Sequence, residues 1–92
     1  MKKVYAVEWN NNEAYEDHAW GVWCVCMTRE KAEEMAARLN EEVERVDGEI
    51  YRLSNEGKWQ EADALERPYM DRMYYFHLAM VKFDVREYEL VE

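Results

Sequence analysis

Apolar residues recur at alternating steps of four and three through the middle of the chain. They are Ala32, Ala36, Leu39, Val43, Val46, Ile50 and Leu53. This spacing is the heptad seam of a long helix that presents one narrow apolar stripe to a neighbouring surface. Thr28 is a natural N-cap for the helix. Gly48 lies off the seam, which keeps its phase across it, so we predict one continuous helix to about Leu53. A turn at residues 47–48 that divides the helix is the alternative.

Two short, largely apolar runs predict strands before this helix, at residues 3–9 and 20–27. Between them, an asparagine-rich turn at residues 10–13 leads into an acidic loop that we expect to be exposed. The two strands should therefore form an antiparallel hairpin. The second strand is apolar on both alternating faces, which predicts cover on both sides. Its even face is Trp20, Val22, Cys24 and Cys26, and its odd face is Gly21, Trp23, Val25 and Met27.

After the long helix, the pattern predicts a short second helix and a last strand. The helix covers about residues 58–66, and Pro68 ends it. Alternation from Arg72 to about Val85 predicts the strand, which residues 86–92 either extend or follow as a short edge strand. The order ββααβ predicts an α+β fold, a small antiparallel sheet with the long heptad-patterned helix and the short helix on one face. A chain of 92 residues predicts a single domain, residues 1–92.

Two apolar surfaces of this fold lack a predicted cover. One helical layer covers only one face of the sheet. The long helix also spans roughly 39 Å, whereas eight-residue strands reach about 27 Å, so the helix should extend beyond the sheet. Either the chain's own loops or a second copy of the chain covers the second sheet face, and because two apolar surfaces are left uncovered we predict a homodimer. The residues assigned to self-association are Leu39, Val43, Val46, Ile50 and Leu53.

The chain is acidic, with 21 Asp and Glu against 12 Lys and Arg and a formal net charge of −9. Such a charge repels nucleic acid and anionic membranes, so we expect neither as a direct partner. The acid concentrates in residues 28–67, and an acidic helix face can steer the chain toward a basic surface on a protein partner. With two aromatic anchors, the predicted partner-binding residues are Glu34, Glu41, Glu42, Glu44, Glu49, Tyr15 and Trp59. A solvated helix face without a partner is the alternative.

Candidate chemistry is sparse along the chain. The three glycines are isolated, and the only serine is Ser54. Cys24 and Cys26 lie two apart in a strand, on one face, where they cannot easily bond to each other, so we predict free thiols in a reducing cytoplasm. Either thiol with His77 would make a Cys-His enzyme site, but a packed thiol is the expected state. We predict no enzyme, no cofactor, no metal site, no signal peptide and no transmembrane segment.

Several strings resemble small uncharacterised proteins of bacteriophages and prophages. They are Val4-Tyr5-Ala6-Val7, the polar loop of residues 11–17, Thr28-Arg29-Glu30-Lys31-Ala32-Glu33 and Glu87-Tyr88-Glu89-Leu90. In those proteins a β-hairpin leads into a similar helix, and a similar strand closes the chain. The resemblance implies a setting in the cytoplasm of an infected bacterium. It implies a non-enzymatic inhibitor of a bacterial nucleic-acid-handling or defence protein, in the manner of an anti-CRISPR. A small structural homodimer without an inhibitory role is the alternative.

Overall fold

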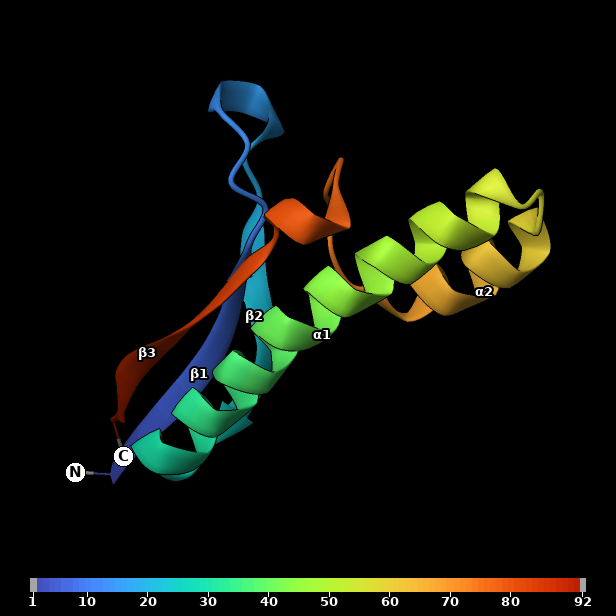
Figure 1. The fold of residues 1–92 in the computed structure, drawn as a ribbon. Helices are drawn as coiled ribbons and strands as arrows, with labels where there is room; N and C mark the ends of the chain where they lie inside the picture. Colours follow the sequence, from blue (N-terminus) through green and yellow to red (C-terminus); the bar gives the residue numbers. More distant parts are fainter. Residues whose placement is uncertain (1, 92) are drawn as a thin grey trace.

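Three strands and two helices make up the structure, a computed structural model that describes residues 2–91 (Figure 1). The elements are β1 (Lys2–Asn10), β2 (Trp20–Cys26), α1 (Arg29–Asn55), α2 (Trp59–Met70) and β3 (Lys82–Leu90). Two single-turn 3-10 helices, η1 (Tyr15–Asp17) and η2 (Leu78–Met80), lie in the connections. The sheet has the order β2-β1-β3 and is antiparallel throughout. The predicted α+β fold in ββααβ order is therefore confirmed.

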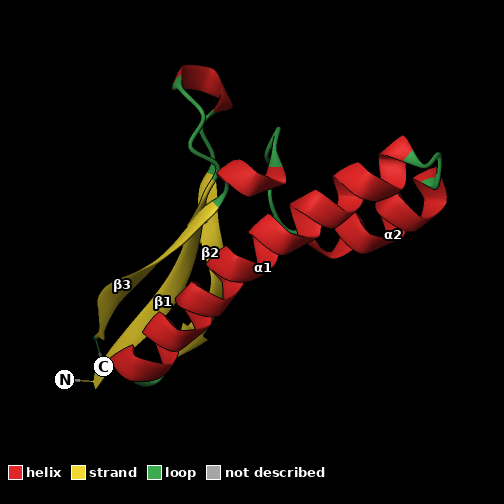
Figure 2. Cartoon of the chain, in the orientation of Figure 1, coloured by secondary structure: helices red, strands yellow, loops and turns green. Residues whose placement is uncertain are grey.

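α1 lies across one face of the sheet and runs on beyond it (Figure 2). Its first part contacts the strands, and its last part contacts α2, which returns alongside it. Six of the seven seam residues are buried, and Ile50 is half-buried against the core. The centre of the core is made by Val7, Val43, Leu78, Val81 and Phe83, each at most 2 % exposed. The seam is thus covered by the chain's own sheet and its own second helix.

α1 begins at the predicted cap and is not interrupted. Thr28 is the N-cap, and its Oγ1 accepts a hydrogen bond from the Lys31 amide at 3.2 Å. The helix continues through Gly48, which confirms the continuous helix over the divided one. Gly48 is exposed, and a methyl group placed there would have no neighbour within 4 Å. The glycine therefore serves no visible packing purpose in the helix.

α1 ends in a Schellman motif two residues later than predicted. The Lys58 amide donates to the Leu53 carbonyl at 2.9 Å, and the Gly57 amide donates to the Ser54 carbonyl at 3.1 Å. Gly57 has φ of 77°, the left-handed conformation that this motif needs and that glycine adopts without steric cost. This turn reverses the chain into α2.

A β-bulge in β2 decides which residues share a face. The register against β1 shifts between Val7 and Glu8. Cys24 pairs with Val7 and Val22 pairs with Glu8, so Trp23 is the extra residue. The predicted even and odd faces are therefore wrong, because strict alternation fails at the bulge. Gly21, Trp23, Cys24 and Cys26 lie on the side of α1, and Trp20, Val22 and Val25 lie on the opposite side.

The predicted cover on both sides of β2 is also wrong for the part of the chain that is described. Trp20, Val22 and Val25 are each at least half exposed. We call this uncovered side of the sheet, opposite α1, the open face. The predicted overhang of α1 is present, but its extra length packs on α2 rather than on a second sheet layer.

β3 begins later than predicted, and α2 ends later. Residues 72–81 form turns and η2 rather than strand; Met73, Leu78 and Val81 are buried in this irregular structure, whereas Tyr74, Phe76 and Met80 are about half exposed. The strand extends to Leu90, and residue 92 lies outside the described residues. Pro68 does not end α2, which runs to Met70. Pro68 lacks an amide hydrogen and its ring crowds the carbonyl four residues earlier, but the helix continues two residues past it, where Tyr69 is buried with its ring stacked on that of Trp23.

Both outer edges of the sheet are partly blocked. On β3, the Asn40 side chain of α1 accepts from the Phe83 amide at 2.8 Å and donates to the Phe83 carbonyl at 3.0 Å. On β2, the Arg72 guanidinium donates to the Trp23 carbonyl and lies 3.5 Å from the centre of the Trp23 ring. These contacts occupy backbone groups that would otherwise accept another strand.

Candidate protein-binding surfaces

The asparagine-rich turn forms as the sequence predicts. Asn12 has φ of 57°, a left-handed conformation that asparagine tolerates better than most residues. Its amide donates to Asn10 Oδ1 at 2.7 Å, and its side chain donates to the Met80 carbonyl at 2.6 Å. The turn is thus joined to the segment that precedes β3.

A buried asparagine organises the loop that follows. Asn11 is 1 % exposed. Its Nδ2 donates to the carbonyls of Asp17 and Tyr74, at 2.8 and 3.1 Å. Its Oδ1 accepts from the amides of Glu13 and Ala19, at 3.1 and 3.0 Å. Two donors and two acceptor positions of the side chain are filled, so the loop is held in one conformation against the segment after α2. The asparagine run was a signal for a turn, but it did not show this network.

The loop presents Tyr15, one of the predicted anchors, in a strained conformation. Tyr15 has φ of 55°, which is uncommon for an aromatic residue. Its side chain is 96 % exposed, so no packing in residues 2–91 compensates for that strain. Glu13, Glu16 and Asp17 make the surroundings acidic. We call residues 13–19 the Tyr15 loop. Strained backbone that the surrounding structure holds in place is typical of binding and active sites.

Three of the five predicted steering glutamates are exposed on α1. Glu34 and Glu41 form no ion pair within residues 2–91, and Glu44 lies 3.9 Å from the Lys82 ammonium of β3. α1 as a whole holds eight acidic and five basic residues. Its exposed side is therefore acidic without being uniformly so, and of the predicted glutamates Glu34 and Glu41 are those without an ion pair within residues 2–91.

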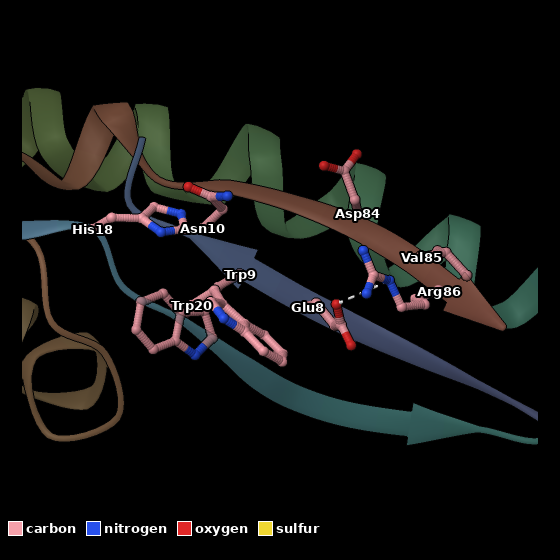
Figure 3. A pocket seen from close by; sticks show the side chains of 8 residues that line it. All are labelled: Glu8, Trp9, Asn10, His18, Trp20, Asp84, Val85 and Arg86. Carbon is pink, nitrogen blue, oxygen red and sulfur yellow. Dashed lines mark ion pairs between the residues drawn. The ribbon is translucent and has the colours of Figure 1, made fainter. Parts of the chain in front are cut away.

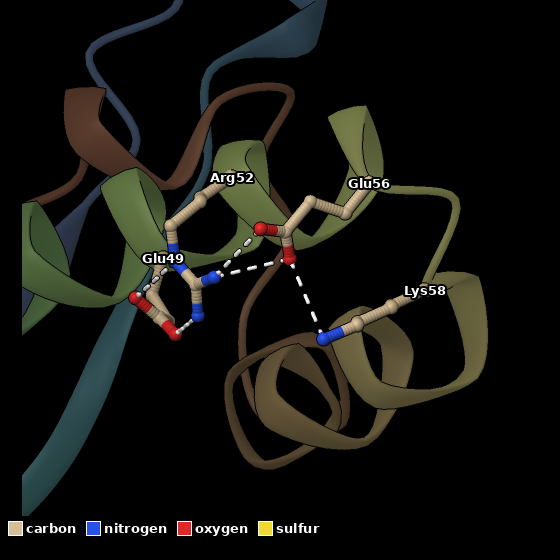
Figure 4. A network of polar contacts seen from close by, with 4 residues as sticks. All are labelled: Glu49, Arg52, Glu56 and Lys58. Atoms are coloured by element: carbon tan, nitrogen blue, oxygen red, sulfur yellow. Dashed lines mark hydrogen bonds and ion pairs between the residues drawn. The ribbon is translucent and has the colours of Figure 1, made fainter.

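The other two glutamates already contact groups of the chain. Glu42 accepts a hydrogen bond from the Tyr69 hydroxyl; burial, together with this bond, raises the pKa of Tyr69. Glu49 pairs with Arg52, whose hydrogen bond lowers the pKa of the Glu49 carboxyl. Figure 4 shows the network at the end of α1, in which Arg52 lies between two carboxylates; its members are Glu49, Arg52, Glu56 and Lys58. These exposed pairs neutralise one another and leave little charge for a partner.

The structure does not bring the predicted aromatic anchors together. Trp59 is exposed at the start of α2, at the far end of the helical hairpin. Tyr15 lies on the loop beyond the end of the sheet, and Figure 1 shows the two places well apart in a molecule 53 Å long. Of the predicted residues, only Tyr15 lies in a rigid loop with other acidic groups around it.

A shallow hollow of about 380 Å³ lies on the open face, where sequence reasoning placed no site (Figure 3). It is lined by Glu8, Trp9, Asn10, His18, Trp20, Asp84, Val85 and Arg86. Arg86 is turned toward Glu8, with 3.6 Å between the guanidinium and the carboxylate. The Tyr88 hydroxyl also donates to Glu8. The apolar run of β2 was the available signal for this surface, but it predicted a covered strand.

The two thiols are free and share one side of the sheet, as predicted. Burial raises the pKa of the Cys24 thiol, the neighbouring Cys26 raises it further, and Arg72 opposes them. A raised pKa reduces the thiolate fraction that a nucleophile needs. His77, the alternative catalytic partner, is exposed just before η2. Within residues 2–91, no three possible metal ligands converge.

The residues assigned to self-association lie inside the chain's own core. Leu39, Val43, Val46 and Leu53 are buried, and Ile50 is half-buried. The seam packs against the sheet and the second helix of the same chain. A dimer of the folded chain would therefore use another surface. Neither helix described here is long and apolar enough to cross a bilayer. No protein-family model, curated protein or solved structure matches the chain.

Proposed function

We propose that this chain is a non-enzymatic protein-binding module that docks its Tyr15 loop on a basic surface of a protein partner. The observation that supports this most strongly is the exposed, left-handed Tyr15 on a loop fixed by the buried Asn11. An exposed aromatic ring on a strained backbone adds nothing to the stability of the free chain. Tyrosine is among the residues that dominate protein interfaces, and a loop ordered before binding loses less entropy on binding.

The charge around Tyr15 indicates the chemistry of the partner. The loop itself is acidic, and the free carboxylates of Glu34 and Glu41 add to the field of the molecule. Proteins that handle nucleic acid carry basic surfaces that such a field attracts. Together with the resemblance to small phage proteins, this favours a bacterial nucleic-acid-handling or defence protein as the partner. Docking on its basic surface would inhibit it by keeping nucleic acid away.

The central experiment replaces Tyr15 with glycine. Tagged protein first captures its partner from a nuclease-treated bacterial lysate, and mass spectrometry identifies it. The affinity of the purified pair is then measured. Tyr15→Gly should weaken binding by about 30-fold, the loss typical of a hot-spot residue. Its free energy of unfolding should stay the same or rise, because glycine accepts the positive φ.

Tyr51→Ala is the matched control, since Tyr51 is also an exposed tyrosine but lies on α1 in regular helix. It should bind like the unaltered chain. Equal affinities for Tyr15→Gly and the unaltered chain would show that the Tyr15 loop is not the docking site. Loss of stability in Tyr15→Gly would show that the left-handed conformation is not strained.

Charge reversal tests the steering role of α1. The double variant Glu34→Lys with Glu41→Lys should slow association with the purified partner, because charge steering acts mainly on the association rate. The control double variant Glu61→Lys with Glu89→Lys changes the net charge equally at exposed acids elsewhere, and it should slow association less. Added salt should slow association of the unaltered chain. If neither added salt nor either double variant changes the association rate, an acidic docking mechanism is excluded.

A further inference from the structure

Along β2, the open face of the sheet is an exposed apolar strip that no part of residues 2–91 covers. On β2, Trp20, Val22 and Val25 are 56 %, 50 % and 57 % exposed and follow one another along the strand. The pairing register places their neighbours from the other two strands on the same side. These are Val4, Ala6, Glu8 and Asn10 of β1, and Lys82, Asp84, Arg86 and Tyr88 of β3. Contiguous exposed apolar side chains with a polar margin are typical of an interaction site.

The open face is close to neutral, whereas the rest of the molecule is acidic. The Lys82 ammonium reaches Glu44 of α1, so, with Lys2 included by the same alternation, the open face holds two basic residues, Lys2 and Arg86, and two acidic ones, Glu8 and Asp84. The whole chain has a net charge of −9, so the acidic excess lies on the helices and loops away from this face. A chain this acidic repels its own copies. The electrostatic repulsion between two copies is smallest when their open faces meet and both α1 helices point outward.

We infer that the open face binds the open face of a second copy, to form a two-fold dimer of stacked sheets. Face contact is favoured over strand addition because Asn40 blocks the edge of β3 at Phe83 and Arg72 blocks the edge of β2 at Trp23. Such a contact is isologous, because both copies use the same surface. One substitution in the chain therefore changes the interface at two positions. This dimer replaces the heptad seam as the surface for self-association.

The size of the face sets the strength of the dimer. Two nine-residue strands and one seven-residue strand give a face of at most roughly 30 by 14 Å, or about 420 Å² from each copy. The total of about 840 Å² is below the roughly 1,200 Å² at which stable interfaces begin. The dimer is therefore a weak one that forms in the micromolar range, and dilution should dissociate it.

Sedimentation of the full chain from about 2 to about 200 µM tests this inference, since a small interface dissociates within that range. The mass should rise from that of the 11.2 kDa monomer toward twice that value. Raising the salt from about 0.02 to about 0.5 M should shift the balance toward dimer by screening repulsion between copies. The partner binding proposed above should weaken under the same change, so the two proposals can fail separately.

Val25→Lys and Tyr51→Lys form a matched pair of variants. Both make the same change in net charge at exposed apolar positions, but only Val25 lies on the open face. Val25→Lys should remain monomeric at every concentration, although its lower net charge alone would favour association. Tyr51→Lys should dimerise like the unaltered chain. Val22→Lys, with its unfolding curve as a check on folding, provides a second open-face variant. A monomer at about 200 µM in high salt, or a dimer that survives both open-face variants, would overturn the inference.

Discussion

Replacing Gly48 with alanine should stabilise the protein by about 0.8–1.0 kcal/mol, the difference in helix propensity between the two residues. Gly48 lies within α1, and a methyl group there meets nothing within 4 Å, so no steric cost offsets the gain. The gain comes from the unfolded state, in which alanine has fewer conformations to lose. In a domain of this size, each kcal/mol raises the melting midpoint by about 4–8 °C. The expected rise is therefore about 3–8 °C.

Gly57→Ala is the control, because it makes the same chemical change with the opposite expected sign. A methyl group on Gly57 also meets nothing within 4 Å, but its φ of 77° is left-handed. Alanine in that conformation costs about 1–2 kcal/mol. Urea unfolding, monitored by circular dichroism, gives the free energy of unfolding of both variants. An unchanged dependence of that free energy on urea concentration shows that the denatured state is the same. If Gly48→Ala loses stability as Gly57→Ala does, α1 is divided at residues 47–48 and the continuous helix is refuted.

Three further measurements test the internal contacts. Asn11→Ala should lower the free energy of unfolding in urea by about 3 kcal/mol, because it leaves buried amide and carbonyl groups unpaired; a loss below about 1 kcal/mol would mean that water replaces the side chain. Iodoacetamide should label Cys24 more slowly near pH 8 than the same cysteine in the urea-unfolded chain, because its raised pKa leaves less thiolate; equal rates would contradict the burial of the thiol. Tyr75 donates to Glu66 at 2.6 Å, and burial with this bond raises its pKa above 10.0, so its stabilising effect is complete below about pH 10 and is lost as the pH rises toward the folded value. Tyr75→Phe should flatten this alkaline loss of stability, and an unchanged pH profile would exclude Tyr75 as its source.

The elements that the sequence predicted well are those with local causes. A seven-residue seam, the Thr28 cap and Gly57 after the last turn define α1 without reference to the rest of the chain. The bulge in β2 has a distant cause. Trp23 is the extra residue, and it lies against Arg72 and Tyr69, more than 40 residues away in sequence. No periodicity in the strand itself could show that alternation would fail there.

The candidate site shows the same division. Tyr15 was predicted to be exposed because its loop is acidic and lies between strands, and this is confirmed. The left-handed backbone of Tyr15 was not predicted. Asn11, which fixes the loop, bonds the carbonyl of Tyr74, 63 residues further along the chain, and local sequence could not show that contact. Glu42 was predicted to bind a partner, but it accepts a hydrogen bond from the Tyr69 hydroxyl because α2 returns alongside α1. Local patterns therefore predicted which residues are polar and exposed, whereas tertiary contacts decided which of them remain available.

The far end of the helical hairpin rests on few buried side chains. Leu53 and Ala62 are buried there, and Ile50 and Leu65 are only half-buried. Local opening of this end therefore requires less free energy than unfolding of the core between α1 and the sheet. Amide hydrogens of residues 50–64 should exchange with solvent through this partial opening, whereas those of β1 should exchange only through global unfolding. A protease would make its first cut at the turn of residues 55–58, and the nicked chain would keep its sheet.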